Sequence, residues 1–230
     1  MNKVLVAGAT GKTGYYFLQH CMNNHPADYE FTYLIRSKEK VERLKERYPD
    51  IKTIVGSLED NSLLNSEIRR GGYDIVINIA GIRHSLNVTE AAIDSSCVRW
   101  LILVHTTGIY SKYKAAGANY REIEGRIEEL LSGTGIALTI LRPTMIYGTL
   151  DDRNVSVFMK LVYKFRYVPV VNNAYYELQP VWYKDLGVAY YDVILHERTT
   201  RNKNYDLSGG KPIMLIDMLK IMGRKLGVKN

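Results

Sequence analysis

Apolar, β-branched runs alternate with helical patterns along the first 143 residues. The runs read KVLVAGA, FTYLIR, IKTIVG, DIVINIA, RWLILVHTT and ALTILRP. The segments between them read YYFLQHCMNN, KEKVERLKERY, LLNSEIRR, VTEAAIDSS and YREIEGRIEELL. Nearly continuous apolar strands separated by helices are typical of a parallel sheet that is covered on both faces. The pattern therefore predicts an α/β fold with a doubly wound parallel sheet.

The rhythm changes after Pro143. Residues 144–230 contain a helical pattern at NVSVFMKLVYKFR, a turn at NNAYYELQP, a helix from Trp182 to about Leu195, a short strand YDLS and a last helix. We expect residues 1–143 to form a core and residues 144–230 to complete it within one integrated domain. Ligands of open parallel sheets bind at the carboxyl ends of the strands. We therefore expect the C-terminal part to form a small lobe over the substrate side.

Composition is ordinary for a globular protein, with 46% hydrophobic and 24% charged residues among 230. No apolar run reaches the about 20 residues that a membrane-spanning helix needs. The first strand pattern begins at Lys3, so we expect a cytoplasmic protein with no membrane partner. Cys21 and Cys97 lack metal-ligand spacing. We expect both to be buried free thiols, with no metal and no disulfide.

The net charge of +7 and a pI near 9.2 raise the question of nucleic acid binding. Lysines and arginines are scattered along the chain and interleaved with acids rather than gathered in one run. This distribution favours a solvated basic surface over a nucleic acid interface. A positive field would also attract a small ligand that carries phosphate. We expect a small-molecule substrate and no nucleic acid partner.

The strongest chemical motif is GATGKTG, which places glycines at positions 8, 11 and 14. It follows the first strand directly and opens a helix, which is the context that a dinucleotide-binding turn requires. The glycines permit a tight turn and a close approach of the backbone to pyrophosphate, and the helix N-terminus adds unpaired N–H groups. The motif predicts a set of cofactor contacts. They are Gly8, Thr10, Gly11, Lys12, Thr13 and Gly14.

The end of the second strand decides between the two nicotinamide cofactors. An acidic residue there would bind the ribose 2′-hydroxyl of NAD, and an arginine would accept the 2′-phosphate of NADP. This strand ends in LIRSK, so that Arg36, Ser37 and Lys38 offer donors and no carboxylate. Lys12 in the glycine turn would add another cation. The sequence favours NADP over NAD, and the alternative is that Arg36 only begins an exposed charged helix.

Five segments in this order carry a resemblance to a known family: GATGKTG, DIVINIAG, VHTTG, LRPTMIYG and QPVWYKDLGVAYYDV. The chain resembles the short-chain dehydrogenase/reductase superfamily, in its extended and atypical branches related to NAD-dependent epimerases and dehydratases. The resemblance implies a Rossmann-like fold. It also implies that Ala80, Gly81 and Pro143 lie near the cofactor and that Thr107 hydrogen-bonds a substrate oxygen. The chain departs from the family at Ser57, where an acidic residue near the adenine is common.

The family places a catalytic tyrosine on the helix after the fifth strand, with a lysine one turn later. Tyr120 fits that position, but Glu124 stands in place of the lysine. At about 100° per residue Tyr120 shares an inward stripe with Ile123 and Ile127, and Glu124 lies at the edge of the stripe. In the alternative interpretation, Tyr120 is a core aromatic residue and Glu124 is a surface partner of Arg121.

A second tyrosine, Tyr110, does have a lysine four residues later, at Lys114. It follows Thr107 too closely to lie on the next helix, so we predict that Tyr120 is the tyrosine in the site. Without a cationic partner a phenol of pKa ~10 is ionised in about one molecule in a thousand at neutral pH. Alcohol oxidation would be slowed most, whereas carbonyl reduction needs the neutral phenol as proton donor.

Two functions of different class follow. The first is an NADP(H)-dependent oxidoreductase or epimerase-like enzyme that acts on a small carbonyl compound or a nucleotide-linked sugar, with Tyr120 and Thr107 at the reacting oxygen. The alternative is a non-catalytic module that senses NADP(H) or binds a partner, for which Glu124 is the best argument. A homodimer is compatible with either function.

Overall fold

The computed structural model describes residues 1–112, 114–166 and 168–228, and for residues 114–116 it describes the backbone alone. The first part of the chain alternates strands and helices as predicted. Its strands are β1 (Asn2–Ala7), β2 (Tyr29–Ile35), β3 (Lys52–Val55), β4 (Ile75–Asn78), β5 (Trp100–Val104) and β6 (Ala137–Pro143). Its helices are α1 (Lys12–Asn24), α2 (Lys38–Arg47), α3 (Asn61–Gly71), α4 (Ser85–Ser95) and α5 (Lys114–Leu131), with short 3-10 turns η1 (Ile82–His84) and η2 (Thr107–Tyr110).

A seven-stranded sheet forms the centre of the molecule, in the order β10-β6-β5-β4-β1-β2-β3, where β10 is Asn204–Leu207. Each neighbouring pair of strands in this sheet is parallel. The chain builds outward from β1 to β3 on one side and then crosses to β4 and builds outward on the other. The strand order therefore reverses between β1 and β4, where open parallel sheets bind their ligands. The predicted doubly wound, Rossmann-like sheet is confirmed.

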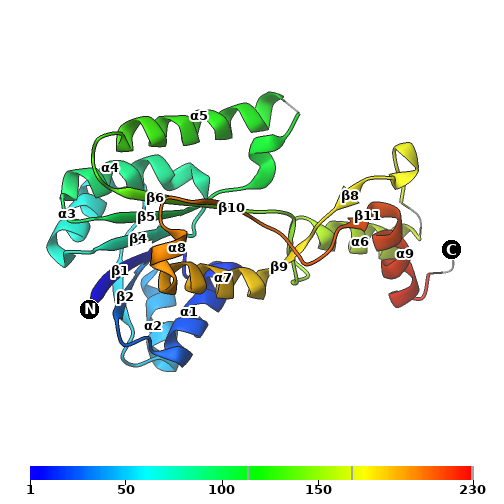
Figure 1. Cartoon of the computed structure of the whole chain (residues 1–230). Helices are drawn as coiled ribbons and strands as arrows, with labels where there is room; N and C mark the ends of the chain where they lie inside the picture. Colours follow the sequence, from blue (N-terminus) through cyan, green and yellow to red (C-terminus); the bar gives the residue numbers. More distant parts are fainter. Residues whose placement is uncertain (113, 167, 229–230) are drawn as a thin grey trace.

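Helices cover both faces of this sheet (Figure 1). Alternate residues of β1 point to opposite sides, with Val4 and Val6 in the apolar core beneath α1 and α7, and Leu5 and Ala7 in the core beneath α3, α4 and α5. Because both faces are buried, most strand positions favour apolar residues, which explains the nearly continuous apolar runs.

The C-terminal part is divided between the core and a lobe. Helix α7 (Tyr183–Leu195) packs against α1, and β10 extends the sheet beside β6, so residues 183–207 complete the core. The remaining elements form the lobe that stands at the right of Figure 1. They are β7 (Ile146–Tyr147), α6 (Val155–Phe165), η3 (Asn172–Ala174), β8 (Glu177–Leu178), β9 (Val181–Trp182), β11 (Ile213–Met214) and α9 (Leu215–Lys225), while α8 (Glu197–Thr200) follows α7.

The lobe has a small core of its own. Five residues are buried in it, namely Val162, Ala174, Met218, Leu219 and Met222. Elsewhere, Cys21 is a buried free thiol, and Cys97 is half-buried rather than buried as expected. No helix in the described part of the chain is both long and apolar enough to span a bilayer. Within the same residues, no group of histidine, cysteine and acidic side chains has the arrangement of a metal site.

Candidate functional site

A cavity of about 330 Å³ opens at the carboxyl ends of β1, β2 and β4, where the strand order reverses. Its lining includes five of the residues that the sequence predicted as cofactor contacts: Gly8, Thr10, Gly11, Arg36 and Ala80. The rest of the lining is Ala7, Leu34, Ile35, Lys40, Gly56, Ser57, Leu58, Ile79 and His84. The sequence motif and the topological switch point therefore coincide in one cavity.

The three glycines of the turn are needed for different reasons. Gly8 has φ +90°, and a Cβ there would lie 2.5 Å from the Ala80 nitrogen. A Cβ on Gly14 would lie 2.2 Å from the Gly8 oxygen, so Gly14 allows α1 to pack against the turn. A Cβ on Gly11 would meet only the Gly8 oxygen, at 3.4 Å. Because Gly11 lines the cavity, its missing side chain leaves room for a ligand rather than for the protein.

Helix α1 begins at Lys12, with Gly11 at its N-cap and no acidic residue in its first turn. The N–H groups of Lys12, Thr13 and Gly14 have no acceptor within the helix, as in the first turn of any α-helix. Unpaired N–H groups and the positive end of the helix dipole favour an anion here. The geometry suits a pyrophosphate that crosses the glycine turn.

Two cations border the other end of the cavity. Arg36 is exposed at the end of β2, and Lys40 lines the cavity from the first turn of α2. No hydrogen bond or ion pair to a described residue engages either side chain. Ser37 is the N-cap of α2 and accepts the Lys40 N–H at 3.3 Å. Sequence reasoning named Lys38 and missed Lys40, although α2 brings Lys40 back over the strand end within one turn.

Lys12 lies elsewhere than expected. Its ammonium nitrogen is 2.8 Å from Asp151 Oδ1, and Lys12 does not line the cavity. The hydrogen bond from Lys12 holds the pKa of the Asp151 carboxyl below its usual value. Lys12 thus links the start of α1 to the loop before α6 and does not join Arg36 as a second cation.

An apolar slot lines the part of the cavity beyond β2. Leu34, Leu58 and Ile79 contribute to it, and Ser57 lies beside them in the position where the family commonly has an acid. The Ser57 hydroxyl accepts the Glu59 N–H at 3.2 Å. A slot of this composition suits a flat aromatic ring, although it offers no carboxylate to the ring's amino group.

The predicted substrate-side residues lie together at the carboxyl ends of β5 and β6. The Thr107 hydroxyl donates to the Pro143 carbonyl oxygen at 3.2 Å. The half-buried Tyr120 ring approaches Gly108 so closely that a Cβ there would lie 3.1 Å from it. Its hydroxyl makes no hydrogen bond to any residue that the structure describes. Gly81, in the turn after β4, has φ +103°.

Glu124 is buried, which corrects the expectation that it lies at the edge of the helix stripe. Its Oε1 accepts from Arg142 Nε at 3.0 Å, its Oε2 accepts from Arg142 Nη2 at 2.5 Å, and His105 Nδ1 lies 2.9 Å from Oε1. The alternative pairing with Arg121 is wrong, because Arg121 donates to the Ile109 carbonyl oxygen at 2.6 Å. Burial alone would raise the pKa of Glu124, but the hydrogen bonds from His105 and Arg142 outweigh it and hold the pKa below its usual value.

Tyr110 lies at the exposed edge of this cluster, beside β10, with the Arg142 guanidinium 6.0 Å from its ring centroid. Its ring is 58% exposed, and its hydroxyl donates to Asp206 Oδ1 at 3.0 Å. Desolvation and the bond to this carboxylate raise the pKa of the Tyr110 phenol, which keeps it neutral. The proposed pairing with Lys114 lies outside the described side chains.

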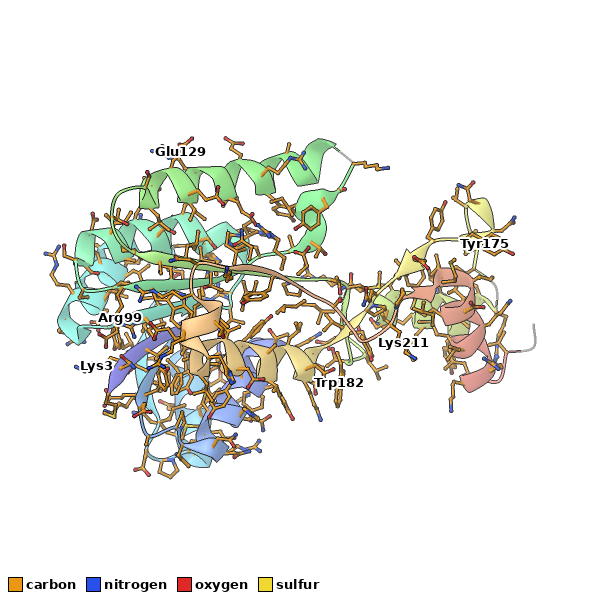
Figure 2. The ribbon with its side chains drawn as sticks, in the orientation of Figure 1. Lys3, Arg99, Glu129, Tyr175, Trp182 and Lys211 are labelled. Atoms are coloured by element: carbon orange, nitrogen blue, oxygen red, sulfur yellow. The ribbon has the colours of Figure 1, made fainter. Side chains whose placement is uncertain are left out.

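A second, larger hollow of about 690 Å³ lies in the C-terminal lobe. Its lining is mostly apolar and comprises Tyr147, Val155, Met159, Pro180, Trp182, Asp185, Gly209, Gly210, Lys211, Pro212, Ile213, Met218, Ile221, Met222, Lys225 and Leu226. Figure 2 shows Trp182 and Lys211 where the lobe meets the core. The Thr144 hydroxyl, one residue after Pro143, donates to the Gln179 carbonyl oxygen at 2.6 Å. Pro180, the residue after Gln179, lines the hollow, so this hydrogen bond joins one wall of the hollow to the strand end that carries Pro143.

The profile of a family described as NAD(P)H-binding matches residues 8–160. An oxidase from an Acremonium species is 33% identical over 90 residues, which are 39% of this chain and 25% of that protein. The chloroplast stem-loop binding protein of 41 kDa b from Arabidopsis thaliana is 26% identical over 183 residues, 75% of this chain and 48% of that protein. The chain thus spans a quarter and about half of the lengths of these two relatives.

A solved structure shares the fold over nearly the whole chain. The nucleoside-diphosphate-sugar epimerase from Staphylococcus aureus superposes with a TM-score of 0.77 and 18% identity, covering 99% of this chain and 78% of that one. This likeness in fold agrees with the resemblance that the sequence motifs indicated.

Proposed function

The chain belongs to the NAD(P)H-binding family, and on this premise we propose that it is an NADP(H)-dependent carbonyl reductase related to the extended and atypical short-chain dehydrogenases/reductases. One observation carries the proposal. The cavity at the switch point is bordered by Arg36 and Lys40 and has no acidic residue in its lining. A 2′-phosphate would gain two charge-assisted contacts there, whereas the 2′-hydroxyl of NAD would find no carboxylate.

Calorimetric titration tests the cofactor. We expect NADPH to bind at least about tenfold more tightly than NADH, a difference of ~1.4 kcal/mol. Arg36→Ala and Lys40→Ala each narrow that difference. Lys12→Ala is the matched control, because its ammonium pairs with Asp151, and it leaves the difference unchanged. Equal affinities for the two cofactors in the unaltered protein would contradict the proposal.

The residues beside Pro143 then supply the chemistry on the substrate. NADPH supplies the hydride when it is bound. Tyr120 donates a proton to the carbonyl oxygen as a neutral phenol. The Thr107 hydroxyl orients that oxygen by turning its hydrogen bond from the Pro143 carbonyl oxygen to the substrate. Glu124 stands where the family has its lysine, and Arg142 engages both of its carboxylate oxygens. Among the described side chains no cation replaces that lysine beside Tyr120, which favours reduction over alcohol oxidation.

The substrate class follows from the hollow in the lobe. Its walls include three methionines and Trp182, with Lys211 among its few charged residues. Such a lining favours a small, largely apolar carbonyl compound over a nucleotide-linked sugar, whose diphosphate and hydroxyl groups need many polar partners. NADPH oxidation across a panel of aromatic and aliphatic aldehydes and ketones, with UDP-glucose beside them, tests this choice. Turnover of the sugar nucleotide alone would refute it.

A non-catalytic NADP(H) sensor is the second candidate, and the buried Glu124–Arg142 pair is the observation that favours it. Glu124 replaces the lysine of the family's tyrosine–lysine pair, and a protein can bind a dinucleotide without turning over a substrate. Binding of NADPH together with no hydride transfer to any member of the panel would support the sensor.

A further inference from the structure

Five buried polar residues form a continuous hydrogen-bonded network between α5 and the turn after β4, residues 79–81, here called the cofactor turn. They are Asn78, Ser85, His105, Glu124 and Arg142, and each is at most 8% exposed. They come from β4, α4, the end of β5, α5 and β6. Buried polar groups of this kind are costly unless every one of them is paired. None of these five residues takes part in the proposed reaction.

With His105 as a neutral imidazole, the donors and acceptors among these five residues have one consistent assignment. The Glu124 carboxylate only accepts, so His105 Nδ1 carries the proton that fills the 2.9 Å contact. The other nitrogen of the neutral ring then accepts, and it lies 2.9 Å from the Ser85 hydroxyl, which donates to it. Ser85 Oγ in turn accepts from Asn78 Nδ2 at 3.2 Å. Glu124 therefore sets the tautomer of the neutral His105 ring. Through Ser85 it adds a hydrogen bond that favours the same orientation of the Asn78 amide as the contacts that Asn78 makes with the turn.

Asn78 holds the turn that lines the cavity. Its Oδ1 accepts the Ala80 N–H at 3.0 Å, and its Nδ2 donates to the Gly81 carbonyl oxygen at 3.1 Å. Ala80 lines the cavity, and the Ala80 nitrogen lies 2.5 Å from where a Cβ of Gly8 would stand. A flipped amide would place its NH₂ group against the Ala80 N–H, so the turn would have to move beside the glycine turn.

We propose that Glu124 is a positioning residue for the cofactor turn, acting through His105, Ser85 and Asn78 to hold Ala80 and Gly81 in the binding geometry. This inference rests on the proposed dinucleotide site. Glu124, which stands in the place of the family's lysine, thus contributes to cofactor binding without contacting the cofactor. A buried ion pair of this kind need not stabilise the fold more than apolar residues of the same size would, so stability and positioning can be separated.

The experiment compares variants that break the network at two points. Ser85→Ala removes the middle hydroxyl, and Ser95→Ala on the same helix is the matched control, because its hydroxyl donates to the Ala92 carbonyl oxygen and does not reach Asn78. Glu124→Leu with Arg142→Met replaces the ion pair as a unit with apolar side chains. The readouts are the NADPH dissociation constant, the melting temperature, and the hydrogen-exchange rate of the Ala80 amide without ligand.

We expect Ser85→Ala and the Glu124→Leu/Arg142→Met variant each to raise the NADPH dissociation constant about tenfold and to speed Ala80 exchange. Each variant leaves a buried His105 nitrogen without its partner, so the melting temperature should fall by several degrees while the protein stays folded. Combining them should add little, because both break the same network. If the ion-pair replacement binds NADPH like the unaltered protein and protects Ala80 equally, the pair is only structural and the proposal is overturned. Should the unaltered protein bind neither NADPH nor NADH, the proposed function fails, and Ala80 exchange still decides the positioning role.

Discussion

Substituting alanine at two glycines of the same turn should separate ligand binding from folding. At Gly14 a Cβ would lie 2.2 Å from the Gly8 oxygen, about 1.2 Å closer than the 3.4 Å of an ordinary contact. The obstacle is backbone, so α1 or the turn must move. Overpacking of this kind costs roughly 1–3 kcal/mol of folding free energy. We therefore expect Gly14→Ala to be clearly destabilised.

Gly11→Ala should instead fold normally. Its φ of −77° and ψ of 169° suit any residue, and the new Cβ would meet only one protein atom, at 3.4 Å. Losing glycine at the N-cap costs a few tenths to about 1 kcal/mol, and the reduced freedom of the unfolded chain returns about 0.4–1 kcal/mol. The net change in unfolding free energy is close to zero. The methyl group would occupy the space beside the first turn of α1, where a pyrophosphate would pass.

Urea unfolding and calorimetric titration with NADPH, applied to both variants, provide the assay. Gly11→Ala should match the unaltered protein in urea midpoint and bind NADPH at least about 100-fold more weakly, a loss of ~2.7 kcal/mol. Gly14→Ala should show the lowered midpoint. Normal NADPH binding by a folded Gly11→Ala variant would show that the glycine motif is only a turn, and the reasoning would fail.

Four further outcomes are expected. Once a carbonyl substrate is found, Tyr120→Phe should lower the reduction rate by ~10²-fold or more while Tyr110→Phe changes it little; the opposite result would identify Tyr110 as the proton donor. Arg142→Met alone should lower the unfolding free energy by about 3–5 kcal/mol in chemical denaturation, because it leaves the Glu124 charge buried and unpaired. Because the pKa of Glu124 is lower in the folded protein than its usual value of 4.5, its ionised form stabilises the fold fully above pH 4.5. That stabilisation is lost as the pH falls through the lower pKa of the folded state. Unfolding free energy measured against pH should show this loss, and the Glu124→Leu/Arg142→Met variant should lack it. Binding of an apolar carbonyl compound should change the fluorescence of Trp182, which is 38% exposed in the hollow of the lobe, and a Trp182→Phe variant should lose that signal.

The sheet could be predicted from the sequence because burial on both faces requires long apolar runs, which are visible locally in the sequence. The glycine turn was equally accessible, since its residues are adjacent in the chain. Lys40 was missed because its role depends on how far the first turn of α2 winds back over the end of β2.

The contacts of Glu124 could not be predicted from sequence. Its partners Arg142 and His105 are 18 and 19 residues away along the chain and reach it only because β5 and β6 are neighbours in the sheet. The spacing of apolar residues along a helix shows that a position faces inward, but it does not show which polar group that side chain will contact. The pairing of Lys12 with Asp151 had the same cause, because no local pattern links the start of α1 to the loop before α6.

The place of β10 and α7 in the core affects how the protein is made. A ribosome releases β1 to β6 first, yet the outer edge of β6 stays open until Asn204–Leu207 emerges, and α1 lacks its main neighbour until α7 is complete. An open strand edge is prone to pair with other chains. The nascent core, residues 1–143, is therefore exposed to misassembly while residues 144–207 are being made, and a chain that stops at Pro143 should need a chaperone to remain dispersed.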